Sequence, residues 1–253
     1  MIRVLFSVLA LALAGPATAE EVVADLSRDE VAITANFDGS DILIYGAVKR
    51  EAAPDTDAPL EVIITVSGPS EPVTVRKKDK RYGIWVNTEA VEVDSAPSFY
   101  AITATGRLNE ILDATEDLRH KISIPRAIRS VGAPSDVENA PRFTDALIRI
   151  REAEDLYQRR DDSVQLFEET LFSTTVDLPA NLVEGPYETL IYLVRDGKVV
   201  DRHSTSINVN KVGLERWIYD LAHDKPLIYG ILSLVIAISA GWLASAVFRY
   251  IRF

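Results

Sequence analysis

The sequence contains no cysteine. This absence excludes disulfide bonds, thiolate metal ligands, a cysteine nucleophile and an acylated N-terminal cysteine. Histidine is also scarce: His120, His203 and His223 lie far apart in the chain, and none falls in a metal-binding spacing such as H-x-x-x-H. We therefore expect no metal centre and no cofactor, and we expect the histidines to have surface or capping roles.

Short motifs that mark catalysis or nucleotide binding are also missing. The sequence has no G-x-S-x-G, no G-x-x-x-x-G-K-[ST] and no G-x-G-x-x-G pattern. Adjacent acids occur at Asp161-Asp162 and Glu168-Glu169, but in an acidic chain such pairs are typical of solvated loops rather than of a glycosidase site. We predict that the protein is not an enzyme. A hydrolase whose site is assembled only in the folded chain is a less favoured alternative.

Basic residues are too few to balance the acidic ones. The chain has 38 Asp and Glu against 27 Lys and Arg, a net charge of −11. All 38 acids lie between Glu20 and Asp224, where only 23 of the bases lie, so this stretch carries 23 − 38 = −15. Such a body repels phosphate backbones, which argues against nucleic-acid binding. Apolar residues make up 47% of the 253 positions, enough for a folded core of one large or two modest domains.

Residues 1–19 have the form of a secretory signal peptide. Arg3 supplies a positive start, residues 4–14 are an apolar run broken only by Ser7, and Ala17-Thr18-Ala19 is an A-x-A cleavage site before Glu20. The run is too short to cross a membrane comfortably. We expect the mature chain to start near Glu20 and to be exported.

Residues 226–248 contain no charged side chain. At about 1.5 Å per residue a helix of this length reaches about 34 Å, enough for a hydrocarbon core of about 30 Å. We predict a single transmembrane helix here, with a basic cytoplasmic tail at 249–253. Together with the signal, this predicts a single-pass membrane protein whose bulk is exported and whose C-terminus is cytoplasmic.

The exported body is predicted to be mainly β. Residues 20–105 show period-two alternation and turn residues, and they form a predicted β-sandwich-like region that resembles an immunoglobulin-like antiparallel sandwich. We predict a hairpin from residues 31–37 and 41–48, joined by Asp38-Gly39-Ser40, and a further strand at 61–67.

The pattern then changes to helix and back to strand. Residues 106–162 form a predicted helical connector, with apolar side chains at helical spacing from Phe143 to Tyr157. Residues 163–212 form a second predicted β region, in which Asp196-Gly197 is a clear hairpin turn. These strands either form a second small domain or complete a sheet with the first region.

Three candidate interaction sites follow from the sequence. A basic patch interrupts the acidic trend and could hold an anion, lipid head groups or an acidic partner, although a solvated hairpin tip is the favoured interpretation. Residues 213–225 form a predicted amphipathic juxtamembrane helix that carries Trp217 at the interface or packs against the body. Small residues repeat every fourth position in the membrane helix and form a potential packing face. The patch is Arg76, Lys77, Lys78, Lys80 and Arg81, and the packing face is Ser233, Ala237, Gly241 and Ser245.

The chain resembles an uncharacterised alphaproteobacterial transmembrane protein family, often encoded beside sulfite-exporter-like permeases. The resemblance covers nearly the whole mature chain and implies a transport accessory role without transferring any catalytic residue. It is most specific around the juxtamembrane helix. The matching segments are Phe37-Asp38-Gly39 with Gly46, Ala146-Leu147-Ile148, Leu171-Phe172, Leu178-Pro179-Ala180-Asn181 with Gly185 and Tyr187, residues 215–223, Pro226, Tyr229-Gly230 and Gly241-Trp242.

These observations lead to a leading hypothesis and an alternative. The first is a non-catalytic, membrane-anchored periplasmic protein that serves as an accessory or interaction module for a membrane transporter or envelope complex. Its partners would be the lipid bilayer and, through the membrane helix, a multi-span permease or a second copy. The alternative is a periplasmic module that binds or senses a small anion, such as a sulfur oxyanion, through the basic patch.

Overall fold

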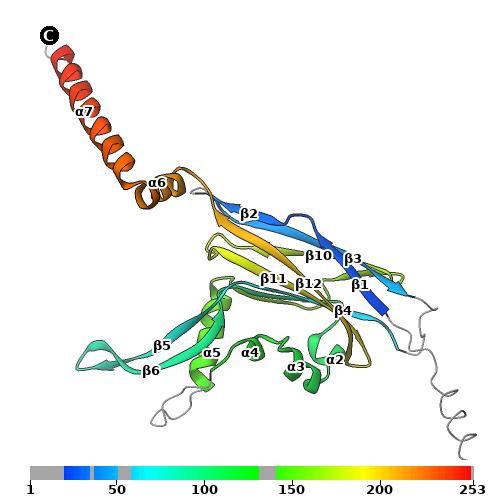
Figure 1. Ribbon diagram of the computed structural model, residues 1–253. Helices are drawn as coiled ribbons and strands as arrows, with labels where there is room; N and C mark the ends of the chain where they lie inside the picture. The colour runs from blue at the N-terminus through cyan, green and yellow to red at the C-terminus, as the bar shows by residue number, and fades with distance from the viewer. Residues whose placement is uncertain (1–19, 35–36, 51–57, 131–140, 252–253) are drawn as a thin grey trace, which may run out of the picture. The chain divides into compact units, whose positions relative to one another are not determined.

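The computed structural model describes residues 20–34, 37–50, 58–130 and 141–251. The predicted signal peptide lies outside these residues. The fold is mainly β with antiparallel sheets, a few helices and one C-terminal apolar helix, as the sequence predicts (Figure 1). The chain divides into two compact units. The larger contains most of residues 20–209, and the smaller contains Ala32–Phe37 and Asn210–Phe253.

One sheet of the larger unit has four strands in the order β1-β3-β10-β9. Each neighbouring pair is antiparallel. Side chains on β3 and β10 alternate between buried and exposed, as expected for strands with one face on a core. The strands are β1 Glu20–Leu26, β3 Ser40–Arg50, β10 Leu171–Leu178 and β9 Gln165–Phe167.

The second sheet has six strands in the order β2-β12-β11-β4-β7-β8. Its β7–β8 pair is parallel. The β11–β12 pair is the hairpin predicted around Asp196-Gly197, and both turn residues have positive φ, of 48° and 74°. The strands are β2 Glu30–Ile33, β12 Lys198–Lys211, β11 Gly185–Arg195, β4 Glu61–Ser67, β7 Tyr100–Ala104 and β8 Tyr157–Arg160.

Strand β4 occupies the centre of the core. Its five middle residues, Val62 to Val66, are all buried, because one face of the six-stranded sheet meets the other sheet and the opposite face meets helices. Figure 1 shows α2, α3 and α4 on this second face. The Tyr100 hydroxyl donates to the carbonyl of Ile122, 2.8 Å away, and so ties β7 to the chain after α3. The helices are α2 Leu108–Ile111, α3 Ala114–His120, α4 Ile124–Ala127 and α5 Pro141–Ala153.

The predicted hairpin at residues 31–48 is wrong. Strand β2 pairs with β12 in the six-stranded sheet, whereas β3 pairs with β1 and β10 in the other sheet. Strand β1 starts at Glu20 and has no counterpart among the individually predicted strands. Alternation of apolar and polar residues indicates that a segment is a strand. The same alternation is compatible with any partner strand that leaves the same face buried, so it does not show which strand lies next to it.

The predicted helical stripe from Phe143 to Tyr157 is too long. Helix α5 ends at Ala153, the backbone reverses at Asp155 with φ of 58°, and Tyr157 begins strand β8. Tyr157 follows the helical spacing of the preceding apolar residues, but it is buried in a strand beside β7. Burial in a sheet requires an apolar side chain just as burial on a helix face does. The two predicted β regions share both sheets: β10 lies beside β3, and β11 lies beside β4.

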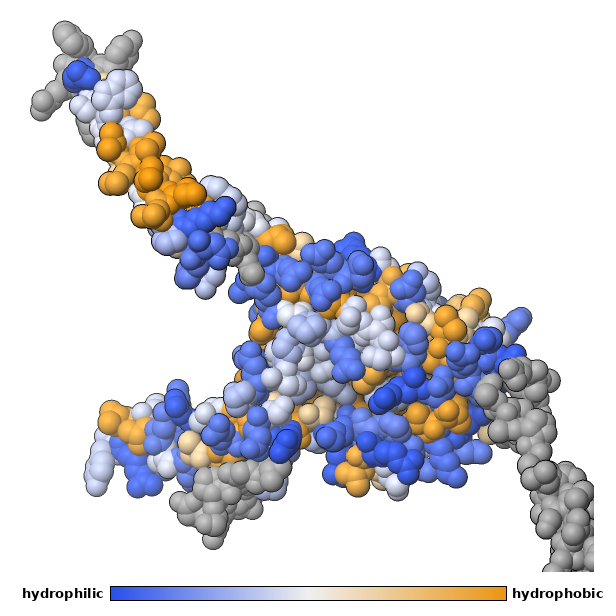
Figure 2. Space-filling view, in the orientation of Figure 1, coloured by the Kyte–Doolittle hydropathy of each residue, from blue (hydrophilic) through white to orange (hydrophobic). Residues whose placement is uncertain are grey.

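The smaller unit contains helix α6, Leu214–Asp224, and helix α7, Pro226–Ile251. Among the described residues, one helical segment, Pro226–Val247, is long and apolar enough to cross a membrane. None of the span is buried by the rest of the chain, and its surface is largely hydrophobic (Figure 2). This agrees with the predicted membrane helix at 226–248.

Candidate functional site

The basic patch lies on a long two-stranded ribbon. Strand β5, Ser70–Arg81, pairs with β6, Ile84–Pro97, in antiparallel register. Tyr82 and Gly83 form the turn with φ of 50° and 88°. Positive φ at both turn residues gives the twist that matches two right-handed strands, so a two-residue connection suffices here.

The two halves of the ribbon differ in burial. Near its base, Val75, Val91 and Val93 are buried. From Arg76 through the turn to Ala90 no residue is buried. These 15 positions hold five basic and two acidic residues, a charge of 5 − 2 = +3 within an acidic chain. The outer half is therefore a basic, solvent-exposed arm.

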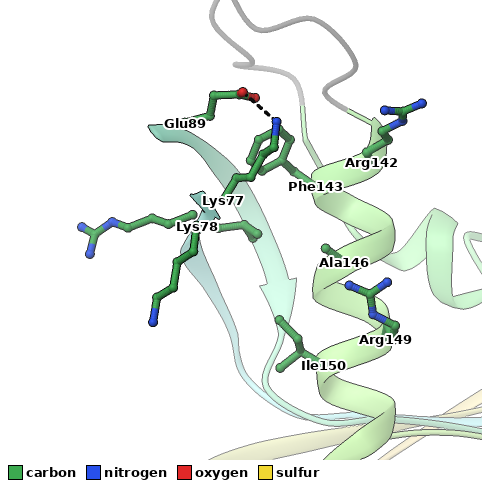
Figure 3. A pocket seen from close by; sticks show the side chains of 10 residues that line it. Lys77, Lys78, Glu89, Arg142, Phe143, Ala146, Arg149 and Ile150 are labelled. Atoms are coloured by element: carbon green, nitrogen blue, oxygen red, sulfur yellow. Dashed lines mark hydrogen bonds and ion pairs between the residues drawn. The ribbon is translucent and has the colours of Figure 1, made fainter. Parts of the chain in front are cut away.

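Helix α5 packs against β5 and forms a cleft with it (Figure 3). Its Phe143 and Leu147 are buried, and Ile150 extends from the helix toward the hairpin. The cleft has a volume of about 790 Å³. Its lining consists of Val75, Arg76, Lys77, Lys78 and Glu89 from the ribbon and Arg142, Phe143, Ala146, Arg149 and Ile150 from α5.

Positive charge dominates this cleft. Among the described residues, ten line the cleft, of which five are basic and one, Glu89, is acidic. Lys77 Nζ is paired with Glu89 Oε1 at 2.8 Å, and both side chains remain exposed. Arg142 and Arg149 are seven residues apart and therefore lie near one face of α5. A concave site with several cations and one carboxylate attracts anions, and the attraction weakens as salt rises.

The structure divides the predicted basic patch. Arg76, Lys77 and Lys78 line the cleft, whereas Lys80 and Arg81 lie next to the turn and do not line it. Sequence reasoning missed Arg142 and Arg149. Their seven-residue spacing predicts a shared helix face, but no local pattern indicates that this helix packs beside residues 76–78.

A second hollow, of about 610 Å³, lies on the four-stranded sheet. Register places Val23 opposite Ala47, Ala47 opposite Leu171, and Leu171 opposite Phe167, so a row of apolar side chains crosses all four strands. Val23, Leu171 and Phe167 are each more than half exposed. We call these four residues, together with the neighbouring exposed Tyr45, the apolar row.

Sequence analysis missed the apolar row because no one strand contains it. Val23 lies on β1, which was not predicted as a separate strand, and Phe167 lies on the three-residue β9. The sequence does contain one indication of this surface. In β3, Leu43 and Tyr45 are apolar at the alternate positions that face away from the core, where polar residues are expected. An exposed apolar patch of this kind is typical of a binding surface.

The candidate residues of the smaller unit lie on its two helices. Trp217 is exposed on α6. Gly241 has no neighbouring atom within 4 Å of the position where a Cβ would stand, so the helix surface is open there. Ser233 donates its hydroxyl to the carbonyl of Tyr229 at 2.8 Å, which satisfies this polar group within the helix. The small residues are Ser233, Ala237, Gly241 and Ser245, all exposed on α7.

Within the described ranges, no group of three or more acidic or histidine side chains is placed to hold a metal. His120 lies beside Glu116, with Nε2 3.4 Å from Oε2, and its ring meets the edge of Tyr192. His223 contacts the carbonyl of Tyr219 at 2.8 Å.

One residue of each predicted acidic pair has an arginine partner. Arg159 donates to both oxygens of Asp161, at 3.0 and 2.8 Å, and this hydrogen bonding lowers the pKa of the Asp161 carboxyl. Glu169 Oε2 lies 3.4 Å from Arg195 Nη2. The lowered pKa suits Asp161 to an ion pair rather than to a general acid, and Glu169 contributes to an ion pair with Arg195.

Comparison with known proteins supplies one family. The family model described as "Putative transmembrane protein (Alph_Pro_TM)" matches residues 21–250. No curated protein matches the chain. Among solved structures, the sporulation control protein Spo0M from Bacillus subtilis is similar, with a TM-score of 0.31 and 10% identity over 81% of this chain. The chain covers 55% of Spo0M.

Proposed function

We propose that this chain, which belongs to the Alph_Pro_TM family, is a non-catalytic interaction module anchored in the bacterial inner membrane by α7. In this proposal the body faces the periplasm and the tail from Arg249 faces the cytoplasm. The apolar span supports the anchor, and the signal-like residues 1–19 support export. The partner would be a membrane transporter, such as a sulfite-exporter-like permease, or an envelope complex.

The apolar row is the observation that carries this proposal. Val23, Leu171 and Phe167 expose large apolar side chains on a sheet face where alternation would normally place polar ones. Burying such a row against a partner removes apolar area from water, at about 25 cal/mol per Å². A hollow on the same face provides a shape into which a partner side chain can fit.

A site-specific crosslinking experiment tests the proposed partner surface. A photoreactive residue at position 171 should give an adduct in intact cells, whereas the same residue at Val200, which is exposed on β12, should not. Phe167→Glu should remove the adduct from position 171, because a charge within the row opposes its desolvation. Equal adducts from both positions, or none from position 171, would remove the row as a partner surface.

The orientation is tested separately with alkaline phosphatase fusions. A fusion after Asp224 should be active, because phosphatase folds only outside the cytoplasm. A fusion after Phe253 should be inactive. The reverse pattern would contradict the periplasmic location and the cytoplasmic C-terminus.

Helix α7 offers a second contact for a membrane partner. Lipid tails are as apolar as leucine, so helices associate in the membrane where small residues allow their backbones to approach closely. The open surface at Gly241 and the small side chains one and two turns away provide such a face. A permease helix or a second copy of this chain would occupy it.

The basic cleft supports a second candidate function, the binding of a small anion such as a sulfur oxyanion. The supporting observation is that folding adds Arg142 and Arg149 to the cations of residues 76–78 around one cleft. Titration of the full chain in mild detergent with sulfate, sulfite and thiosulfate at low salt is the test. Binding should weaken with salt and with Arg142→Gln/Arg149→Gln, but not with Lys198→Gln on β12. No binding at low salt would reject this candidate.

A further inference from the structure

The free end of the β5–β6 ribbon combines cations with large apolar side chains. Lys80 and Arg81 precede the turn, and Tyr82, Ile84 and Trp85 form or follow it. The relative exposures of Tyr82, Ile84 and Trp85 are 105%, 65% and 69%, so most of the surface of these side chains is left uncovered by the described part of the chain. We call these five residues the ribbon tip. Figure 2 shows hydrophobic surface beside charged surface at this end of the hairpin.

The strand register places charge beside apolar surface on both faces of the tip. Lys80 lies directly opposite Trp85, and Arg81 lies directly opposite Ile84. Consecutive residues of a strand point to opposite faces, so each face carries one cation and one large apolar side chain. Asp79 lies 3.6 Å from Arg81 and offsets part of its charge, while Lys80 has no ion pair with a described residue.

The tip is built differently from an ordinary solvated hairpin. Edge strands normally avoid wrong pairing by exposing charges, and Lys80 and Arg81 fit that role. An exposed tryptophan and isoleucine do not fit this protective role, because exposed apolar side chains favour association with other surfaces. A binding surface for the ribbon tip must therefore bury its apolar side chains and also attract its positive charges.

An anionic lipid bilayer provides both properties. Its head groups carry negative charge, and its acyl region begins within the length of one large side chain. Tyrosine and tryptophan favour the interface between these layers. The chain also contains a helix, α7, that is long and apolar enough to cross a bilayer. A second copy of this chain is the competing occupant, because its body is also acidic, and the dependence on protein density described below separates it from lipid.

We propose that the ribbon tip docks on an anionic membrane surface, with Tyr82, Ile84 and Trp85 inserted at the interface and Lys80 and Arg81 among the head groups. This inference rests on the proposed anchoring by α7. The chain would then contact the bilayer at two places, α7 and the ribbon tip.

Tryptophan fluorescence in reconstituted full-length protein tests this docking. The chain has three tryptophans, Trp85, Trp217 and Trp242. Trp217→Phe/Trp242→Phe leaves Trp85 as the sole reporter in vesicles that contain brominated phosphatidylcholine, with or without phosphatidylglycerol. We expect quenching of Trp85 in the anionic vesicles and much weaker quenching in the zwitterionic ones. Lys80→Gln/Arg81→Gln should lower the ratio of docked to free tip about 25-fold.

Two controls separate the docking from the anchoring. Lys49→Gln/Lys198→Gln removes two exposed charges elsewhere on the body and should leave the quenching of Trp85 unchanged. Trp85→Phe/Trp217→Phe leaves Trp242 on α7, which should be quenched in both kinds of vesicle. Unquenched Trp242 would overturn the anchoring and this inference together, whereas quenched Trp242 with unquenched Trp85 would overturn this inference alone.

Two further outcomes would also overturn the docking. Equal quenching of Trp85 in anionic and zwitterionic vesicles would show that Lys80 and Arg81 contribute nothing. A Trp85 emission that shifts with protein density but not with lipid charge would assign the tip to a second copy of the chain.

Discussion

Arg195 and Glu20 are 175 residues apart in the chain, yet they form a bidentate ion pair. Arg195 Nε donates to Glu20 Oε2 and Arg195 Nη2 donates to Glu20 Oε1, each at 2.8 Å. Arg50 Nε donates to the same carboxylate at 2.8 Å. The three side chains are only 11–12% exposed, so the pair is largely removed from water. It joins β1 and β3 of one sheet to β11 of the other.

The substitution Glu20→Gln should destabilise the body by about 2–4 kcal/mol, because it leaves two largely buried guanidinium groups without their main counter-charge. Glu169, 3.4 Å from Arg195, compensates for part of the loss. Denaturant unfolding of the full chain in detergent measures the change. The neighbouring Glu21→Gln is the control: Glu21 pairs with Lys49 at the exposed surface, and its loss should change the free energy of unfolding by less than about 1 kcal/mol. Equal effects would contradict the role of the buried pair.

The same pair predicts a pH dependence. The hydrogen bond from Arg195 is the largest cause that lowers the pKa of the Glu20 carboxyl from its ordinary value of 4.5. A carboxyl with a lowered folded-state pKa adds stability that is present above the unfolded pKa and is lost as pH falls through the folded pKa. The stability difference between wild type and Glu20→Gln should therefore be constant near neutral pH and should shrink below pH 4.5. A difference that grows on acidification would show the opposite sign.

Gly46→Ala should weaken the four-stranded sheet. An added Cβ would lie 2.4 Å from Phe172 Cζ and 2.7 Å from the backbone oxygen of Val23, and the backbone oxygen cannot move unless β1 shifts from β3. We expect a loss of about 1–3 kcal/mol, measured by thermal or denaturant unfolding. Gly230→Ala, where an added Cβ would meet no atom within 4 Å beyond its chain neighbours and the backbone of its own helix, should not lower the stability of the body. An unchanged midpoint for Gly46→Ala would contradict the close approach of these strands.

Phe143→Ala should loosen the contact between α5 and the ribbon. Phe143 is buried at the wall of the basic cleft, and its removal should cost about 3 kcal/mol in stability. Hydrogen exchange should then accelerate at Val75 and Val91, near the base of the ribbon. Ile150→Ala, at a half-exposed position on the same helix, should cost less than about 1 kcal/mol. Unchanged exchange in β5 and β6 would mean that the ribbon does not depend on α5.

Gly241→Leu should weaken helix association in the membrane. Leucine is at least as apolar as glycine, so insertion should be preserved, while its side chain would fill the open surface on which a partner helix would pack. Crosslinking or a two-hybrid assay in membranes measures the association. Ile238→Leu, which changes a bulky residue beside the small-residue face, is the control. The same association for wild type and both variants would reduce α7 to a simple anchor.

Local signals predicted the elements whose shape depends on local chemistry. The β-branched run of β4 was predicted with its observed bounds because a strand buried on both faces is continuously apolar. Asp196-Gly197 predicted the β11–β12 hairpin because these residues readily adopt positive φ. The long uncharged run predicted α7 because the thickness of a bilayer dictates the length of a spanning helix. The basic patch was visible for a similar reason, since five of six consecutive residues carry the charge.

The β-rich class, the apolar C-terminal helix, the acidic body and the basic patch can all be read from the amino-acid sequence, because period, length and charge are local properties. The folded chain is needed to show that β2 joins β12, that Glu20 meets Arg195, that Arg142 and Arg149 flank the ribbon, and that Val23 and Phe167 share one row. Those neighbours depend on which pairing buries the most apolar surface over the whole chain. A strand or helix with one apolar face fits many partners equally well, so that choice belongs to the fold.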